Sequence, residues 1–385
     1  MPFASAISEH PLTAHAVGEA VGQVLETIGP HPDVVMIFVT QPHAGALEDT
    51  AATVRSVLEP TVLIGCASES VVGTGREVEG GPAVSVWAGT FGPAIGLRLT
   101  AHQSDEGIGF DGLPDVVPFV PSALLLLADP YSFPPDEFFA ALDERHPGLP
   151  VVGGMASGAR GYGGSRLTLD GTVLVDGAVG VLLGPGVRVH TVVSQGCRPI
   201  GVPYVVTSSE GQMIRELAGR PALARLDELA NTLTPQDIQV INRTSLHLGR
   251  VIDEHKPTFD RGDFLVRSVL GGDRANGAIA VGDVVEVGTT VQFHIRDAGS
   301  AHEDLTDLVG EAAATASFES ALLFTCNGRG RHLFGTPNHD AGVLTDLLGP
   351  VPTAGMFAAG ELGPVGGGNF MHGFTASIAL FADQT

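Results

Sequence analysis

The sequence predicts an α/β protein with mixed sheets flanked by helices, arranged as two related domains built from repeated β-α-β-β units. The chain has 385 residues, more than the roughly 250 at which a single core stops growing. Hydrophobic residues make up 44% of it and charged residues 16%, so a large core must be buried and a disordered chain is excluded. In addition, one order of elements recurs three times along the sequence.

Each copy of this repeat begins with a short apolar run of the length of a buried strand. A helix-like segment follows, then a proline, a second strand that contains a glycine, and a third strand. The first strand and the glycine are 31, 31 and 34 residues apart, from Val34 to Gly65, Ala123 to Gly154 and Ala321 to Gly355. A strand–helix–strand connection of this length indicates parallel pairing, and the third strand is expected to be an antiparallel neighbour.

The remaining elements place the domain boundary. A helix is expected at Thr13–Ile28, and Gly211–Leu233 predicts one or two further helices. The domain junction is expected within Asn231–Asn242, which gives domains at residues 1–235 and 236–385. Beyond it, short alternating or apolar runs predict the strands of the second domain, at Leu246–Arg250, Phe264–Leu270, Ala278–Val281 and Val291–Arg296.

Composition excludes several classes of protein. Forty-three acidic against 20 basic residues give a net charge of −23, which opposes binding to nucleic acid or to an anionic membrane. The apolar runs are far shorter than the roughly 20 residues of a membrane span, and Met1–Pro11 does not resemble a signal peptide. Three widely spaced cysteines fit a reducing cytoplasm. We therefore expect a cytoplasmic protein.

The common cofactor and metal motifs are missing. The sequence has no CxxC, HExxH or GxSxG pattern and no CxxCH haem attachment site, so no cofactor or metal is expected, and any haem would be non-covalent. Lys256, the only lysine, lies between His255 and Pro257, where it completes no phosphate-binding loop and is a poor candidate for a Schiff base.

The chain resembles the FIST family, with an N-terminal FIST domain followed by a FIST C domain. The resemblance rests on segments spread over nearly the whole sequence: IGCASE (Ile64–Glu69), SQGCRPIG (Ser194–Gly201), ELAGRPAL (Glu216–Leu223), VQFHIRDA (Val291–Ala298), CNGRG (Cys326–Gly330), GELGP (Gly360–Pro364) and NFMH (Asn369–His372). It implies a sensory module that binds a small ligand, with amino acids proposed. Because no output domain is expected in this length, a signal would pass to a separate protein or through a change of homo-oligomer. Some FIST proteins bind haem and sense nitric oxide.

The C-terminal motifs supply the first candidate ligand-binding residues. Cys326, Asn327 and Arg329 follow a predicted strand, and the carboxyl ends of parallel strands are where ligands bind. The Arg329 guanidinium can bind a carboxylate and Glu361 can bind an ammonium group, so together the two residues could bind the charged groups of an amino acid. Alternatively, Arg329 pairs with a structural acid, or the two residues pair with each other. His372 is a candidate ligand residue or haem ligand, or a structural histidine.

A second group of candidates lies in the N-terminal half. These candidates are Glu69, Gln195 and Arg198. They could line a second pocket or the opposite wall of a shared one, or they could be polar residues that keep the ends of loops in contact with solvent. The glycine-rich stretch Gly153–Gly164 is interpreted as turns. The hypothesis is a small-ligand sensor without a catalytic residue. The alternatives are a haem-dependent nitric-oxide sensor, an enzyme that uses Cys326 or Glu361, and an interaction scaffold without a ligand.

Overall fold

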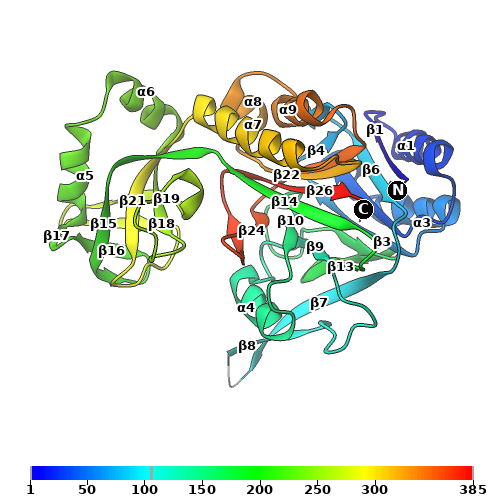
Figure 1. The fold of residues 1–385 in the computed structure, drawn as a ribbon, viewed down its shortest axis with the longest axis horizontal. Coiled ribbons are helices and arrows are strands. Elements are labelled where there is room, and N and C mark those ends of the chain that lie inside the picture. Colours follow the sequence, from blue (N-terminus) through cyan, green and yellow to red (C-terminus); the bar gives the residue numbers. More distant parts are fainter. Residues whose placement is uncertain (1, 105–106, 384–385) are drawn as a thin grey trace. The chain divides into compact units, whose positions relative to one another are not determined.

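The computed structural model describes residues 2–104 and 107–383, which form two compact units. The first unit comprises Met1–Val193, Leu305–Met371 and Thr375–Thr385, and the second comprises Ser194–Asp304 and His372–Phe374. The second unit is thus formed by two segments, one long and one of three residues, that interrupt the chain of the first (Figure 1). The expected division between residues 235 and 236 is not the boundary of these units, since both residues lie within the second.

The first unit contains all three copies of the β-α-β-β repeat. In each copy the first two strands are parallel and the third is antiparallel to the first, as the sequence predicted. The copies are β2 (Val34–Thr40), α3 (Leu47–Leu58), β3 (Val62–Ser68) and β6 (Val84–Gly89); β9 (Ala123–Ala128), α4 (Pro135–Arg145), β10 (Val151–Met155) and β13 (Ala178–Leu183); and β22 (Ser320–Cys326), α9 (His339–Leu348), β23 (Thr353–Ala358) and β26 (Thr375–Ala382).

A β-hairpin from each repeat completes the sheet of another repeat. Each hairpin follows the second strand of its own repeat and pairs with the second strand of a different one. The exchange is cyclic, so that every repeat donates one hairpin and receives one. The pairs are β4 (Ser70–Gly73) and β5 (Arg76–Glu79) on β23, β11 (Leu167–Leu169) and β12 (Thr172–Leu174) on β3, and β24 (Glu361–Val365) and β25 (Gly368–His372) on β10.

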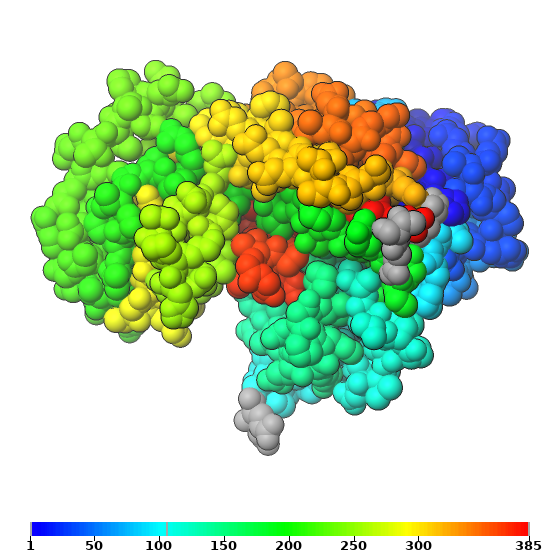
Figure 2. Space-filling view, viewed as in Figure 1, coloured from blue at the N-terminus to red at the C-terminus, as the bar shows by residue number. Residues whose placement is uncertain are grey.

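The strand before each repeat lies at the opposite side of its sheet. These strands are β1 (Phe3–Ser8) beside β6, β7 (Ala94–Ser104) with β8 (Gly107–Asp111) beside β13, and β14 (Arg188–Gln195) beside β26. The remaining helices are α1 (Thr13–Ile28), α2 (Gln41–Ala44), α7 (Ala298–Thr315) and α8 (Gly330–Phe334). Side chains of α8 and α9 form part of the molecular surface (orange in Figure 2).

Alternate residues of the first strands face two different cores, because successive side chains of a strand point to opposite faces. Met36 and Phe38 of β2 join one cluster with residues of all three repeats, including Leu125 and Phe324. Their neighbours on β2 pack against α1 and α3, and in the other repeats the corresponding residues pack against α4 or against α7 and α9. One central core therefore holds the three sheets together, with the helices outside.

The second unit is built around antiparallel strands. The four strands expected beyond the junction are confirmed as β18 (Leu246–Val251), β19 (Phe264–Asp273), β20 (Ala278–Val281) and β21 (Thr290–Arg296). They join β15 (Cys197–Glu210), β16 (Met213–Leu217) and β17 (Arg220–Pro221), and the helices are α5 (Ala222–Ala230), α6 (Pro235–Thr244) and the 3-10 turn Arg261–Asp263.

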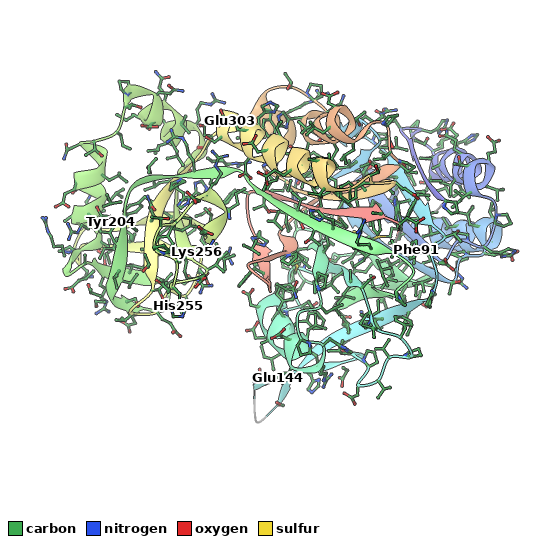
Figure 3. All side chains as sticks on the ribbon, in the orientation of Figure 1. Phe91, Glu144, Tyr204, His255, Lys256 and Glu303 are labelled. Carbon is green, nitrogen blue, oxygen red and sulfur yellow. The ribbon has the colours of Figure 1, made fainter. Side chains whose placement is uncertain are left out.

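The helix expected over Gly211–Leu233 is partly wrong. Met213–Leu217 is a strand because it pairs with both β15 and β20, and helical structure begins only at Ala222, after Pro221. Lys256 lies in this unit, near His255 (Figure 3), and its ammonium pairs with Asp263. Within the described residues, no helix combines the length and the apolar character needed to cross a membrane.

Candidate functional site

A pocket of about 600 Å³ lies where parallel strands of all three repeats end. Its lining residues belong to the first unit and follow the carboxyl ends of strands, where α/β folds bind ligands. The lining residues are Gln41 after β2, Glu69 after β3, Ser157, Gly158, Ala159, Arg160 and Gly164 after β10, Asn327 after β22, and Ala359 after β23.

The pocket carries one charge of each sign and two amides. Arg160 and Glu69 are both exposed at its wall, and neither has an ion pair among the described residues. The Oδ1 atom of Asn327 is buried and accepts no hydrogen bond from any described atom. A buried acceptor without a donor is costly, so Asn327 offers an acceptor to a ligand that carries an N–H or O–H group.

Ser157 fixes the floor of the pocket by joining the three repeats. Its hydroxyl donates to the carbonyl of Phe357 at 2.5 Å and accepts from the amide of Glu69 at 2.9 Å. The next residue is glycine because the chain passes very close to the first repeat. A Cβ on Gly158 would lie 2.8 Å from the backbone of Ala67, and the Gly158 amide donates to the Ala67 carbonyl at 3.2 Å.

Behind Asn327 lies a buried ion pair. Arg329, which is fully buried, donates from Nε and Nη2 to the two carboxylate oxygens of Asp340 at 2.7 and 2.8 Å. Asp340 also accepts from the Thr325 hydroxyl at 2.6 Å. Burial alone would raise the pKa of Asp340, but the facing Arg329 guanidinium holds it well below its ordinary value. The pair therefore stays ionised and anchors α9 behind the pocket.

Two more buried carboxyls flank this pair. Burial raises the pKa of Glu361 to about 8, against the effect of Thr375, whose amide and hydroxyl donate to Oε2 at 3.0 and 2.8 Å. The Cys326 thiol is adjacent and favours the ionised form of Glu361. Burial, reinforced by the charge of Asp340, likewise raises the pKa of Glu77 to about 7. In the folded protein, therefore, Glu361 is largely protonated below about pH 8 and Glu77 below about pH 7.

This geometry differs from the expectation that Arg329 binds the carboxylate of a ligand and Glu361 its ammonium group. The Arg329 guanidinium is paired with Asp340, which is the structural alternative that the sequence left open. Neither Arg329 nor Glu361 is among the residues that line the pocket. Of the candidates in the first unit, Glu69 and Asn327 line the pocket. Cys326 directly precedes Asn327 in the sequence, and its thiol lies beside Glu361.

The other three candidates lie in the second unit. The Gln195 side chain is buried and donates to the carbonyl of Phe264 at 2.7 Å. Arg198 pairs with Asp237 at 2.5 Å and with Asp297 at 3.2 Å. His372 is the last residue of β25 and is only 3% exposed. Among the described residues, no three His, Cys, Asp or Glu side chains are placed to hold a metal ion.

Sequence reasoning missed Gln41, Ser157 and Arg160. Gln41 occupies the position directly after the first strand of its repeat, as Asp129 and Asn327 do in the others. Aligning the three copies at the ends of their first strands would have identified it. Arg160 was not identified because the stretch Gly153–Gly164, which contains it, was interpreted only as turns.

Comparison with known proteins agrees with the family resemblance. The family model described as FIST N domain matches residues 33–220, and that described as FIST C domain matches residues 222–364. The uncharacterised protein Rv0628c of Mycobacterium tuberculosis is 45% identical over 383 residues, which cover 98% of each chain. The uncharacterised protein Mb0898c of Mycobacterium bovis is 43% identical over 381 residues, 97% of each chain. The chain belongs to the FIST family.

Proposed function

We propose that the first unit binds an amino acid or another small carboxylate in the pocket between the three repeats, and that occupancy is reported to a separate partner or through an oligomer change. FIST domains are associated with sensory roles and with the binding of small ligands. The observation that carries the proposal is the lining of one pocket by Arg160, Glu69 and the unsatisfied acceptor of Asn327.

The chemistry of these three groups matches a zwitterion. Arg160 offers a planar fork that can donate two parallel hydrogen bonds to a carboxylate. The carboxylate of Glu69 and the Oδ1 atom of Asn327 are both acceptors, which suits an ammonium with three donors. A carboxylate without an ammonium would use Arg160 and leave the Asn327 acceptor unsatisfied. We therefore expect amino acids to bind more tightly than the matching simple acids.

The pocket walls supply a route for reporting occupancy. Loops from all three repeats contribute to the pocket, and Ser157 already links them. A ligand that touches loops of different repeats favours whichever arrangement brings them closest. It shifts the protein between two arrangements only as far as its affinities for them differ.

We also place the protein in the cytoplasm. None of the three cysteines forms a disulfide in the described part of the chain, and Cys66 and Cys197 are buried. The Cys66 thiol contacts the sulfur of Met356 at 3.2 Å, and burial raises its pKa, so it is an inert packing group. Cysteines outside disulfides suit a reducing compartment.

The test is isothermal titration calorimetry with amino acids and their matching simple acids, after a thermal-shift screen. A ligand at about 100 times its dissociation constant adds about 2.7 kcal/mol of stability, which such a screen detects. We expect Arg160→Ala and Glu69→Gln each to weaken binding at least tenfold.

Arg274→Ala and Glu144→Gln are the matched controls. Arg274 is exposed in the second unit, and Glu144 is exposed on α4, outside the pocket (Figure 3). Both should bind as the wild type does. Unchanged affinity in Arg160→Ala and Glu69→Gln, or no response of the wild type to any compound, would count against the proposal.

A further inference from the structure

A second pocket, of about 470 Å³, adjoins the first and has a different chemical character. It also belongs to the first unit. Its walls are prolines, aromatic rings and methionines, with one serine. The lining residues are Pro130, Tyr131, Ser132, Phe133, Pro134, Pro135, Met155, Ala359 and Met371. Phe133 and Met155 are 3% and 2% exposed, so they form a fixed apolar base.

Three connections make the two pockets neighbours. Ala359 lines both. Met155, at the end of β10, lines the second pocket, and Ser157, two residues further along, lines the first. The Tyr131 hydroxyl donates to the carbonyl of Ala159 at 3.2 Å, so the loops of the two pockets are tied together. A ligand bound in the first pocket therefore has an apolar wall within reach.

The polar side chains of the second pocket are already occupied. The Ser132 hydroxyl donates to Asp129 at 2.5 Å and accepts from the amide of Gly177 at 2.8 Å. The Tyr131 hydroxyl is used by Ala159. What these residues offer to a ligand is therefore carbon and sulfur surface, which favours an apolar group.

One buried carboxylate holds both loops in place. Asp129, which is 1% exposed, accepts from Ser132 in the loop of the second pocket and from Ser165 at 2.5 Å, directly after the loop of the first. The loops are thus fixed relative to each other before any ligand arrives. A ligand with a group for each pocket would order little additional structure on binding.

We propose that the second pocket receives the side chain of the ligand, and that the natural ligand is an amino acid with a large apolar or aromatic side chain. This inference rests on the proposed function, since the charged end of the ligand must sit against Arg160 and Glu69. The side chain then lies against Tyr131, Phe133 and the methionines. Because each added buried methylene strengthens binding severalfold, phenylalanine and leucine should bind at least about tenfold more tightly than alanine.

The experiment measures the dissociation constants of alanine, leucine and phenylalanine for the full-length protein. The wild type is compared with Met371→Ser and Tyr131→Ser, which reduce the apolar wall from two sides. We expect both variants to lose most of the preference for phenylalanine over alanine, and in Met371→Ser the affinity for alanine should change by less than about twofold. Met371→Leu, which keeps an apolar side chain, should keep the preference.

Val120→Ser is the matched control, because Val120 is an exposed apolar residue outside both pockets. Circular dichroism and melting temperature establish that each variant is folded. Equal binding of alanine and phenylalanine by the wild type, or an unchanged preference in both serine variants, overturns the inference and leaves the proposed function standing. If no amino acid or carboxylate binds the wild type, the proposed function fails, and this inference fails with it.

Discussion

Ser157 is the residue on which the geometry of the pocket most depends, because its hydroxyl bonds to two other repeats. The Cys66–Met356 sulfur contact joins side chains of the first and third repeats. Such contacts between repeats were not predictable from the sequence. Local pattern indicates which face of a strand a residue occupies, but not which distant residue lies opposite.

Replacing Ser157 with alanine should destabilise the protein by about 1–3 kcal/mol, since it leaves the Glu69 amide and the Phe357 carbonyl without their partner. Urea denaturation measures this change. In the control Ser56→Ala, an exposed hydroxyl loses a bond only to Thr53 within α3, and the change should stay within about 0.5 kcal/mol. Equal effects of the two substitutions would show that Ser157 does not link the repeats.

Glu361 makes stability fall as the pH rises. Its pKa is about 8 in the folded protein and near the ordinary 4.5 when unfolded. Between these values the folded chain holds a proton that the unfolded chain has released, so the free energy of unfolding decreases with increasing pH. Glu361→Gln replaces the carboxyl group by an amide that does not titrate, so this difference in bound protons disappears. We expect the downward slope between pH 5 and 8 to become shallower by up to about 1.4 kcal/mol per pH unit.

The measurement for Glu361 is the free energy of unfolding against pH for the wild type and Glu361→Gln. Glu144→Gln, an exposed carboxyl on α4, serves as the control and should keep the wild-type slope. An unchanged slope in Glu361→Gln would mean that Glu361 is ionised in the folded protein at neutral pH.

At the scale of elements, β18 and β21 of the second unit place two histidines opposite each other. His247 pairs in register with His294, and burial lowers the pKa of both to about 4. The neighbouring Arg296 lowers the pKa of His247 further. Both rings are therefore neutral in the folded protein at neutral pH.

The second unit should accordingly loosen in acid. Between about pH 6.5 and pH 4 the histidines bind protons in the unfolded chain but remain neutral in the folded one. The free energy of unfolding therefore decreases as the pH falls through this range. Hydrogen exchange of β18 and β21 amides at pH 5 and pH 7, corrected for the intrinsic pH dependence of exchange, reports it. In His247→Gln the loss of protection should be smaller. Identical behaviour of variant and wild type would exclude His247 as a cause.

Among the elements, the three repeats were predicted well and the second unit less well. Apolar runs, prolines and glycines at regular spacing indicate β-α-β-β units directly. Met213–Leu217 was missed because pairing with β15 and β20, rather than local preference, makes it a strand. In the candidate site, Asn327 was identified because it follows a predicted strand, and Glu69 because it belongs to the N-terminal motif Ile64–Glu69. The partner of Arg329 was not, since Asp340 lies on a separate helix.

For the whole molecule, the exchange of hairpins makes the first unit indivisible. The first two repeats each depend on the third, because the β4–β5 hairpin requires β23 and β10 requires β24. The match of the FIST N model to residues 33–220 describes a stretch of sequence, whereas the compact unit also needs residues after 305.

A fragment of residues 1–193 should therefore fail to fold into a stable unit. It would leave β10 and the β4–β5 hairpin without their partners, and it would expose the apolar core that β22 and β23 complete. The measurement is a urea transition with proteolysis, in which the full chain should be cooperative and resistant. A cooperative, protease-resistant fragment would contradict the prediction.

The insertion of the second unit shows where this fold accepts foreign sequence. Its longer segment, Ser194–Asp304, runs from the end of β14 into α7, which precede the third repeat, whereas β1 and α1, which precede the first repeat, are joined by residues 9–12 alone. A circularly permuted fluorescent protein placed there would be connected to the repeat that contributes Gln41 and Glu69, and under the proposed function its fluorescence would change when a ligand fills the pocket.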